Sequence, residues 1–342
     1  MSSRQTSLSF LDIARSLGCV AVVAIHAVGL SSVLLGQGSE VSWWTKTIVT
    51  AFSVWAVPVF VMISGALLLD PPREESARFF YTKRFWRVGL PALFWIPFYF
   101  VVDHFYRGDS LNVVSLFRRL VFSSYDHLYF LVLILQLYVL TPYLRKVVKH
   151  ASTRSLFGLV LLFFVIAAFW EKTSFAGTMF VPFIGYYLLG AYLIRVSVPR
   201  RLMALWAGMF LGAGSMIVLL TYLVSRRDEL AYLQDTFFYS HNKPLVMLLA
   251  VSAFLLLQSF TSSFQKLGNV WTQRVHQFSK VSFRIYILHP VILYLTASLL
   301  KNLGRVQEIP WWGLLLLIPY TVLLSGLITS RLQRNRYLIK LV

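Results

Sequence analysis

Residues 10–33, FLDIARSLGCVAVVAIHAVGLSSV, form the stretch that decides the fold. The stretch is long and apolar enough to cross a membrane as one helix, yet it carries Asp12, Arg15, Cys19 and His26, here called the polar stripe. At about 100° per residue, Arg15 and His26 fall on nearly the same side, about 16 Å apart along the axis. Ionisable groups inside a span are costly unless they face protein or a water-filled cavity. The sequence therefore predicts that the polar stripe faces a functional site.

The composition of the whole chain is typical of a membrane protein. Hydrophobic residues make up 58% and charged residues 13% of its 342 residues, against ~45–50% and ~25% in soluble domains. Ten apolar runs are candidate spans, the fifth and sixth being short: residues 10–33, 47–69, 87–106, 126–146, 155–171, 178–195, 202–224, 244–261, 281–300 and 311–330. No soluble domain interrupts them. We expect an all-α polytopic membrane protein with about ten transmembrane helices, folded as a single integral-membrane domain over residues 1–342.

The net charge of +19 would favour nucleic-acid binding in a soluble protein. Here the basic residues lie between apolar runs, where they determine topology, so no nucleic-acid partner is expected. With the N-terminus in the cytoplasm, about two thirds of the Lys and Arg residues fall on the cytoplasmic side. This asymmetry predicts that both termini are cytoplasmic, with Arg15 near the cytoplasmic face and His26 nearer the outer face.

Metal and disulfide chemistry have little support in the sequence. Cys19 is the only cysteine, which excludes an intramolecular disulfide. The seven histidines are scattered and lack a ligand spacing such as HExxH. We therefore expect no metal site.

The segment 83–91, KRFWRVGLP, offers a second candidate site. It places Arg84 and Arg87 one helical turn apart at the predicted cytoplasmic face, where two guanidinium groups can hold phosphate oxygens bidentately. Ordinary positive-inside anchoring beside an interfacial Trp is the alternative. The pattern alone leaves both interpretations open.

Other polar positions have both a functional and a structural interpretation. Ser64 and the glycine after it let helices approach closely, and without a GxSxG elbow we do not take Ser64 as a nucleophile. The position of His127 at the outer end of the fourth span, taken alone, favours an ordinary interfacial histidine, and His289, before a proline, is compatible with a residue that stabilises a helix kink. Within the sixth span, packing or a cavity is indicated by Pro182, Gly185 and Gly190.

Taken in chain order, these motifs resemble those of the acyltransferase-3 family of bacterial integral-membrane acyltransferases. The matching positions, which extend over essentially the whole chain, are residues 11–15 with His26, 60–65, 84–87 with Pro91, 127–131 and 287–290. The family usually has Trp where this chain has Tyr129. The chain looks like the membrane-only branch, similar to the enterobacterial common antigen and exopolysaccharide O-acetyltransferases.

The resemblance implies a multi-pass O-acyltransferase of the bacterial inner membrane. Such enzymes transfer an acyl group, most often acetyl from acetyl-CoA, to a hydroxyl of a surface glycan or its lipid-linked precursor. The resemblance also implies that Arg15 and His26 are essential, with Arg84 and Arg87 as further functional positions. No permanently bound cofactor is expected, membrane lipids surround the chain, and the oligomeric state is left open.

The residues themselves suggest how such a reaction would run. A positioned imidazole can take the proton of a sugar hydroxyl, which makes His26 the candidate general base; a covalent acyl relay through its nitrogen is the alternative. Asp12 cannot orient His26, because fourteen residues place it ~21 Å away, and we expect it to pair with Arg15. The partner of His26 must come from another helix. Arg15, together with Arg84 and Arg87, is expected to bind the CoA phosphates.

Three other interpretations remain open. A transporter or flippase of a glycan or small organic anion would also place polar groups within spans, and would move glycan without acyl-CoA. A structural subunit of a glycan-export complex would tolerate loss of His26. A thioester relay through Cys19 is also conceivable, but a lone small cysteine in an apolar helix usually serves packing, and full activity of Cys19→Ser would exclude the relay.

Overall fold

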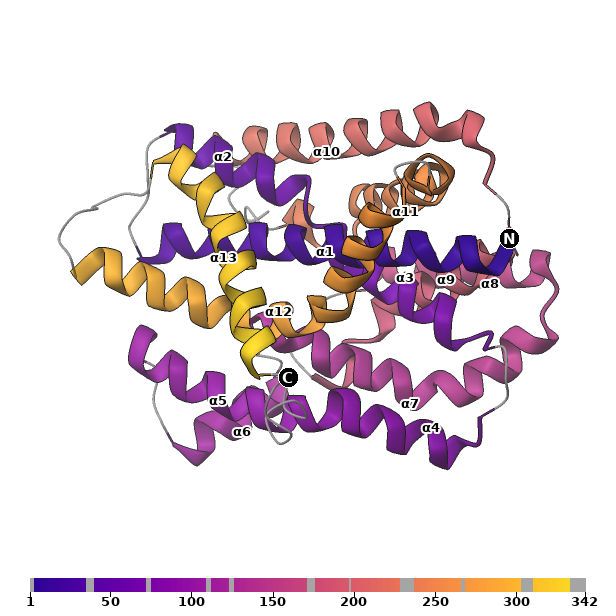
Figure 1. The fold of residues 1–342 in the computed structure, drawn as a ribbon, viewed down its shortest axis with the longest axis horizontal. Helices are drawn as coiled ribbons and strands as arrows, with labels where there is room; N and C mark the ends of the chain where they lie inside the picture. The colour runs from indigo at the N-terminus through magenta and orange to yellow at the C-terminus, as the bar shows by residue number, and fades with distance from the viewer. Residues whose placement is uncertain are drawn as a thin grey trace. The chain divides into compact units, whose positions relative to one another are not determined.

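The computed structural model describes ten segments of the chain: residues 3–34, 40–71, 75–108, 112–122, 126–170, 176–196, 198–227, 237–265, 268–302 and 310–332. Within these segments every regular element is a helix and no strand occurs (Figure 1). The predicted all-α fold is therefore confirmed.

Eight helical segments among the described residues are long and apolar enough to cross a membrane: Phe10–Gly29, Glu40–Leu68, Ala77–Phe105, Tyr129–His150, Arg200–Ser225, Phe237–Thr261, Asn269–Leu300 and Trp311–Leu332. They correspond to eight of the ten predicted spans. The fifth and sixth predicted spans are shorter apolar helices, Thr153–Phe169 and Val181–Arg195. The count of ten and the cytoplasmic placement of both termini stay predictions.

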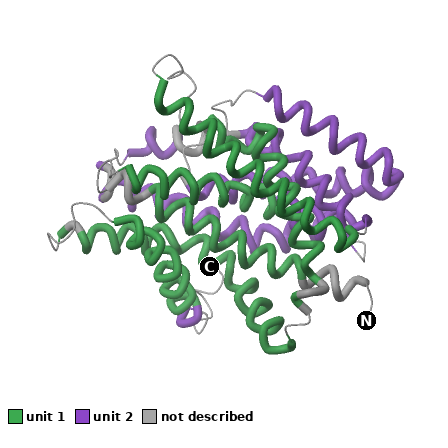
Figure 2. Tube along the Cα trace, turned by 90° about the horizontal axis from the view of Figure 1, so that it is seen from above, with its two compact units in different colours: residues 1–60, 197–329 green, residues 61–196, 330–342 purple. Residues whose placement is uncertain are grey.

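The chain folds into two compact units, coloured separately in Figure 2. Unit 1 comprises residues 1–60 and 197–329, and unit 2 comprises residues 61–196 and 330–342. The expected single domain over residues 1–342 stays a prediction.

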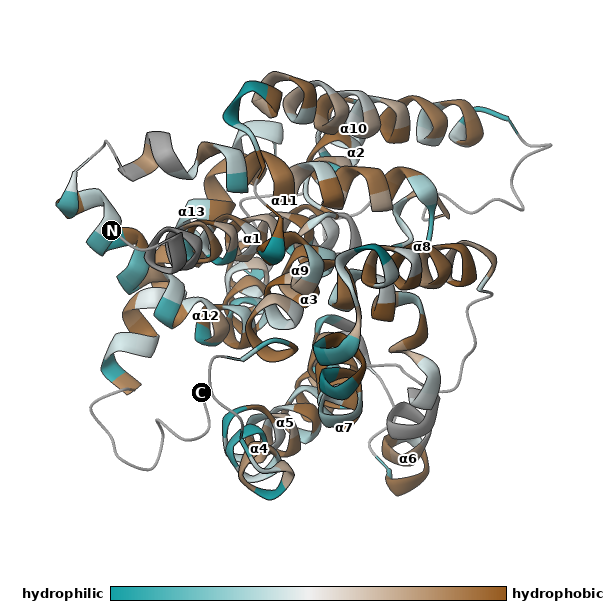
Figure 3. Cartoon of the chain, turned by 90° about the vertical axis from the view of Figure 1, so that its right-hand side faces the viewer, coloured by the Kyte–Doolittle hydropathy of each residue, from teal (hydrophilic) through white to brown (hydrophobic). Residues whose placement is uncertain are grey.

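Unit 1 is built mainly from α1 (Ser3–Leu34), α2 (Glu40–Ala51), α10 (Met203–Ser225), α11 (Pro244–Gln265), α12 (Asn269–Asn302) and α13 (Trp311–Leu332). Helix α1 packs against α12, α11 and α2. One core cluster of buried side chains joins α1, α12 and α13: Cys19, Val23, Ile285 and Val322. Figure 3 shows hydrophobic residues along α10, where leucines that face away from the core, such as Leu211 (57% exposed), provide a surface for lipid.

Helices α1 and α12 run parallel. Their contacts follow the same order along both helices, from Asp12 with His276, through Cys19, to His26 with His289. Two parallel spans are separated by an odd number of crossings. Five of the long spans lie between them, so the two shorter apolar helices either both cross the membrane or both do not.

Unit 2 contains most of α3 (Ala56–Leu68), followed by α4 (Ala77–Arg84), a π-helical turn η1 (Phe85–Gly89), α5 (Leu90–Arg107), α6 (Val113–Phe122), α7 (Tyr129–His150), α8 (Thr153–Phe169) and α9 (Ile184–Arg195). Helices α3 and α9 pack backbone to backbone. A Cβ added to Gly65 would overlap the carbonyl oxygen of Tyr187, and one added to Gly190 would overlap that of Met62. The glycines of the second and sixth predicted spans therefore serve close packing.

Candidate functional site

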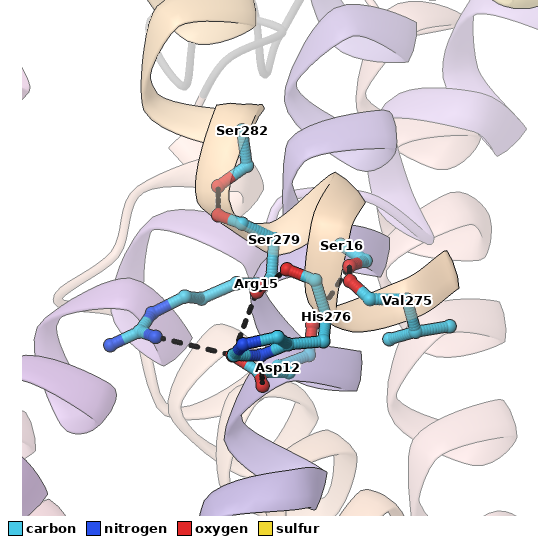
Figure 4. A network of polar contacts seen from close by, with 7 residues as sticks. All are labelled: Asp12, Arg15, Ser16, Val275, His276, Ser279 and Ser282. Carbon is cyan, nitrogen blue, oxygen red and sulfur yellow. Dashed lines mark hydrogen bonds and ion pairs between the residues drawn. The ribbon is translucent and has the colours of Figure 1, made fainter. Parts of the chain in front are cut away.

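The polar stripe of α1 contacts α12 at three levels along the helix, namely at Asp12, at Cys19 and at His26. At its first level the carboxylate of Asp12 accepts three hydrogen bonds (Figure 4). His276 Nδ1 lies 2.7 Å from Asp12 Oδ2, Ser279 Oγ lies 2.7 Å from Oδ1, and Arg15 Nη1 lies 3.4 Å from Oδ1. The expected pairing of Asp12 with Arg15 is confirmed. His276 and Ser279 were missed, although their spacing of three residues puts them on one helix face.

The second level of the stripe is a packing contact. The thiol of Cys19 donates to the backbone carbonyl of Ser282 across 3.5 Å, and its side chain is 1% exposed within the core of unit 1. A buried thiol surrounded by aliphatic side chains fits the packing interpretation of this cysteine.

The third level brings two histidines together. The ring centroids of His26 and His289 lie 5.1 Å apart, with an angle of 47° between the planes. His289 is wholly buried, while His26 is half-buried. His289 Nδ1 lies 2.7 Å from the carbonyl oxygen of Tyr286. A carbonyl can only accept, so Nδ1 carries a proton and donates it to Tyr286. His289 on α12 is therefore a neighbour of His26 through a ring contact, and the residue that orients His26 stays a prediction.

The arginine motif lies on a π-helical turn that the sequence analysis does not predict. The N–H of Leu90 bonds to the carbonyl of Phe85, five residues earlier. Two residues favour this turn: Pro91 has no N–H for a regular α-helical bond, and Gly89 lets the Phe85 ring lie against the backbone, where a Cβ would stand 2.9 Å from it. Such π-helical turns occur frequently at functional sites.

The two arginines of this motif have different surroundings. The guanidinium carbon of Arg84 lies 5.2 Å from the ring centroid of Phe80 and 5.7 Å from that of Tyr138. Its buried Nε has no hydrogen-bond partner among the described residues. Arg87 is exposed. A second guanidinium, that of Arg145, lies 4.6 Å from the Phe80 ring, but it is already bonded to the carbonyl of Leu68.

The remaining candidates lie apart from these groups in the chain. Ser64 is half-buried on α3. His127 is 5% exposed, and its ring lies edge-on to that of Tyr99 at 4.3 Å. Within unit 1 the structure brings together Asp12 with Arg15 and His26 with His289, while Ser64, Arg84, Arg87 and His127 belong to unit 2. Among the residues described, no group of three or more His, Cys, Asp or Glu side chains is arranged to hold a metal ion.

Among the comparisons with known proteins, a family model matches most of the chain. The family model Acyl_transf_3, described as an acyltransferase domain, matches residues 8–330. No curated protein and no solved structure matches the chain. The matched range includes the polar stripe of α1, the arginine motif and α12.

Proposed function

We propose a specific reaction for this chain, which belongs to the acyltransferase-3 family: transfer of an acyl group from acyl-CoA to a hydroxyl of a surface or exported polysaccharide, or of its lipid-linked precursor. Family membership makes the chain an acyltransferase, and its long apolar helices make it a multi-pass membrane protein. The acetyl group, the glycan acceptor and the bacterial inner membrane belong to the proposal. The observation that carries it is the family match over a chain that pairs His26 with His289.

In this proposal His26 is the general base. Its imidazole takes the proton of the acceptor hydroxyl as the oxygen attacks the thioester carbonyl, and general-base help of this kind contributes ~10²–10⁴-fold. The new C–O bond forms, the C–S bond breaks, and CoA leaves as a thiolate that then takes up a proton. A base that works by this route must be neutral before the reaction, which suits an imidazole.

We assign to His289 the positioning of His26. Its Nδ1–H is held by the Tyr286 carbonyl, and this bond fixes the His289 ring against that of His26, with the ring centroids 5.1 Å apart. In serine proteases a carboxylate orients the catalytic histidine and stabilises its charged form. A neutral imidazole can do the orienting part of this task at a lower cost of burial than a carboxylate.

Contacts to the phosphates of the donor are proposed for Arg15 in unit 1 and, as a separate assignment, for Arg84 and Arg87 in unit 2. The buried Nε of Arg84 supports this role, because a buried donor without an acceptor costs free energy that a bound phosphate oxygen would recover. Its two aromatic neighbours hold the guanidinium in place without using its donors. Removal of any one of the three arginine charges is expected to raise the KM for acyl-CoA.

The test is the O-acyl content of the surface glycan in cells that carry wild type or His26→Ala, with protein levels in the membrane matched. His150→Ala, an exposed histidine at the end of α7, is the control. Loss of acyl groups with normal glycan export is expected for His26→Ala alone. Unchanged acylation would remove His26 from the reaction, and glycan retained inside the cell would favour a transporter.

A further inference from the structure

We propose that His276 is a phosphate ligand for the acyl-CoA donor, held in place by Asp12 beside Arg15. The inference rests on the proposed acyl-CoA donor and adds a residue that the sequence motifs do not include. Its basis is the hydrogen-bonded group at the first level of the polar stripe (Figure 4).

The exposed fractions of Asp12, Arg15 and His276 distinguish a largely buried carboxylate from two basic side chains that reach solvent. Asp12 is 16% exposed, whereas Arg15 is 33% and His276 is 53% exposed. The carboxylate accepts from Ser279 and His276 at 2.7 Å each, so its oxygens are already occupied by this chain. Asp12 is therefore a positioning residue that fixes the two basic side chains.

The hydrogen bonds argue against a nucleophilic triad in this group. In a Ser-His-Asp triad the serine lies at Nε2 of the histidine. Here Ser279 donates to the carboxylate Oδ1, and Ser16 donates to the backbone carbonyl of Asp12. Neither hydroxyl is bonded to the imidazole. His276 is thus oriented by its carboxylate without a serine to activate.

The orientation of His276 suits an anion. With Nδ1 directed to Asp12, Nε2 lies on the far edge of a ring that is more than half exposed. In its doubly protonated form the ring donates Nδ1–H to Asp12, and Nε2–H is then directed to an anion at the far edge. The guanidinium of Arg15 adjoins the same carboxylate, and Lys280 is exposed one turn further along α12.

These groups are suited to a phosphate, and a phosphate monoester such as the 3′-phosphate of CoA carries a charge of about −1.5 to −2 and three acceptor oxygens. Acyl-CoA brings a diphosphate and a 3′-phosphate. A lipid headgroup is a second source of the same group, since Asp12 lies near one end of the first apolar span, Phe10–Gly29. We assign the phosphate to the donor, and the experiment separates the two sources.

The experiment measures the Kd for CoA of the purified full chain in phosphatidylcholine nanodiscs. His276→Ala is expected to bind CoA about tenfold more weakly, at the low end for a hydrogen bond to a charged group because the ring is half exposed. Arg274→Gln is the matched control: it removes a charge from an exposed position on the same helix, where the side chain stacks on Trp271. Its Kd should stay within twofold of wild type.

Equal affinity for CoA in His276→Ala and wild type would overturn the inference while leaving the acyl-CoA donor intact. An equal loss in Arg274→Gln would also overturn it, since the effect would then be one of general surface charge. If His276→Ala binds CoA normally but loses anionic lipid from the purified protein, the phosphate is that of a headgroup and the assignment to the donor is wrong. A wild-type protein that binds neither CoA nor acetyl-CoA would instead refute the proposed donor.

Discussion

Two chemically identical substitutions, Gly190→Ala on α9 and Gly158→Ala on α8, are predicted to have opposite effects on stability. A Cβ at Gly190 would overlap a backbone carbonyl oxygen of the facing helix, a position at which real Cβ atoms are essentially never found. At Gly158 on α8 the same Cβ would have no atom of the described chain within 4 Å. Gly190→Ala should therefore destabilise the protein, and Gly158→Ala should not.

The size of the difference follows from what each alanine meets. Overpacking against side chains that can move costs ~1–3 kcal/mol, and the obstacle at Gly190 is backbone, so we expect a loss of at least ~3 kcal/mol. An unobstructed Gly→Ala change inside a helix gains ~0.5–1 kcal/mol. The two variants should differ by about 4 kcal/mol, with opposite signs relative to wild type. Gly65→Ala should behave like Gly190→Ala, because it also meets a carbonyl oxygen.

The assay is unfolding in mixed detergent micelles by added SDS, followed through tryptophan fluorescence, with the midpoint compared among the variants. Retained monodispersity in gel filtration before unfolding ensures that the folded states are being compared. If Gly190→Ala unfolds at the same SDS fraction as Gly158→Ala, α3 and α9 do not approach closely enough for the argument to hold.

Three further outcomes are expected. Cys19→Ala should retain acyl transfer, and the wild-type thiol should resist a maleimide until the protein unfolds, because the thiol is 1% exposed and bonded to Ser282; rapid labelling of the native protein would contradict this. His289→Gln should lower kcat by tenfold or more with little change in the KM for acyl-CoA, as for loss of transition-state stabilisation; a change confined to KM would place it in donor binding. Arg226→Ala should shift the unfolding free energy by less than about 1 kcal/mol, because its pair with Glu40 is exposed; a loss of several kcal/mol would show that the pair is structurally essential.

The periodicity of residues 10–33 was sufficient to place four polar side chains on one side of a helix, and the structure confirms the pairing of Asp12 with Arg15. The side chains that this face contacts come from α12, and Asp12 and His276 are 264 residues apart in the sequence. A local sequence pattern cannot predict a contact over that separation. His26 and His289 were each singled out from their own surroundings. Only the packing of α1 on α12 brings their rings together.

His276 was missed because hydropathy detects the apolar part of a helix and not its polar extension. The ninth span was expected at residues 281–300, yet α12 begins at Asn269. The polar first turns of α12 are stabilised by packing on α1 and by the bonds to Asp12. A polar segment of this kind reads as a loop unless its partner helix is known.

Local breaks in the helices have recognisable chemical causes, although they were not predicted. The second span, expected as one helix over 47–69, is divided at residues 52–55, and Pro58 lies in the first turn of the helix that follows, where a proline is tolerated. The π-helical turn before Pro91 is a similar case. Proline shows that a hydrogen bond is missing, but the sequence does not show how the backbone accommodates the loss.

The pairing of α1 with α12 also has a consequence for biosynthesis. Helix α1 is made first, but the side chains that cover its ionisable groups are made about 264 residues later. At ~5–20 residues per second this delay is about 13–50 s. During that time Asp12, Arg15 and His26 sit in an apolar helix without the neighbours that make them tolerable in a bilayer. Until α12 has been synthesised and inserted, the ionisable side chains of α1 must therefore be kept out of the hydrocarbon, either by the insertion machinery or by contact with water at the membrane surface.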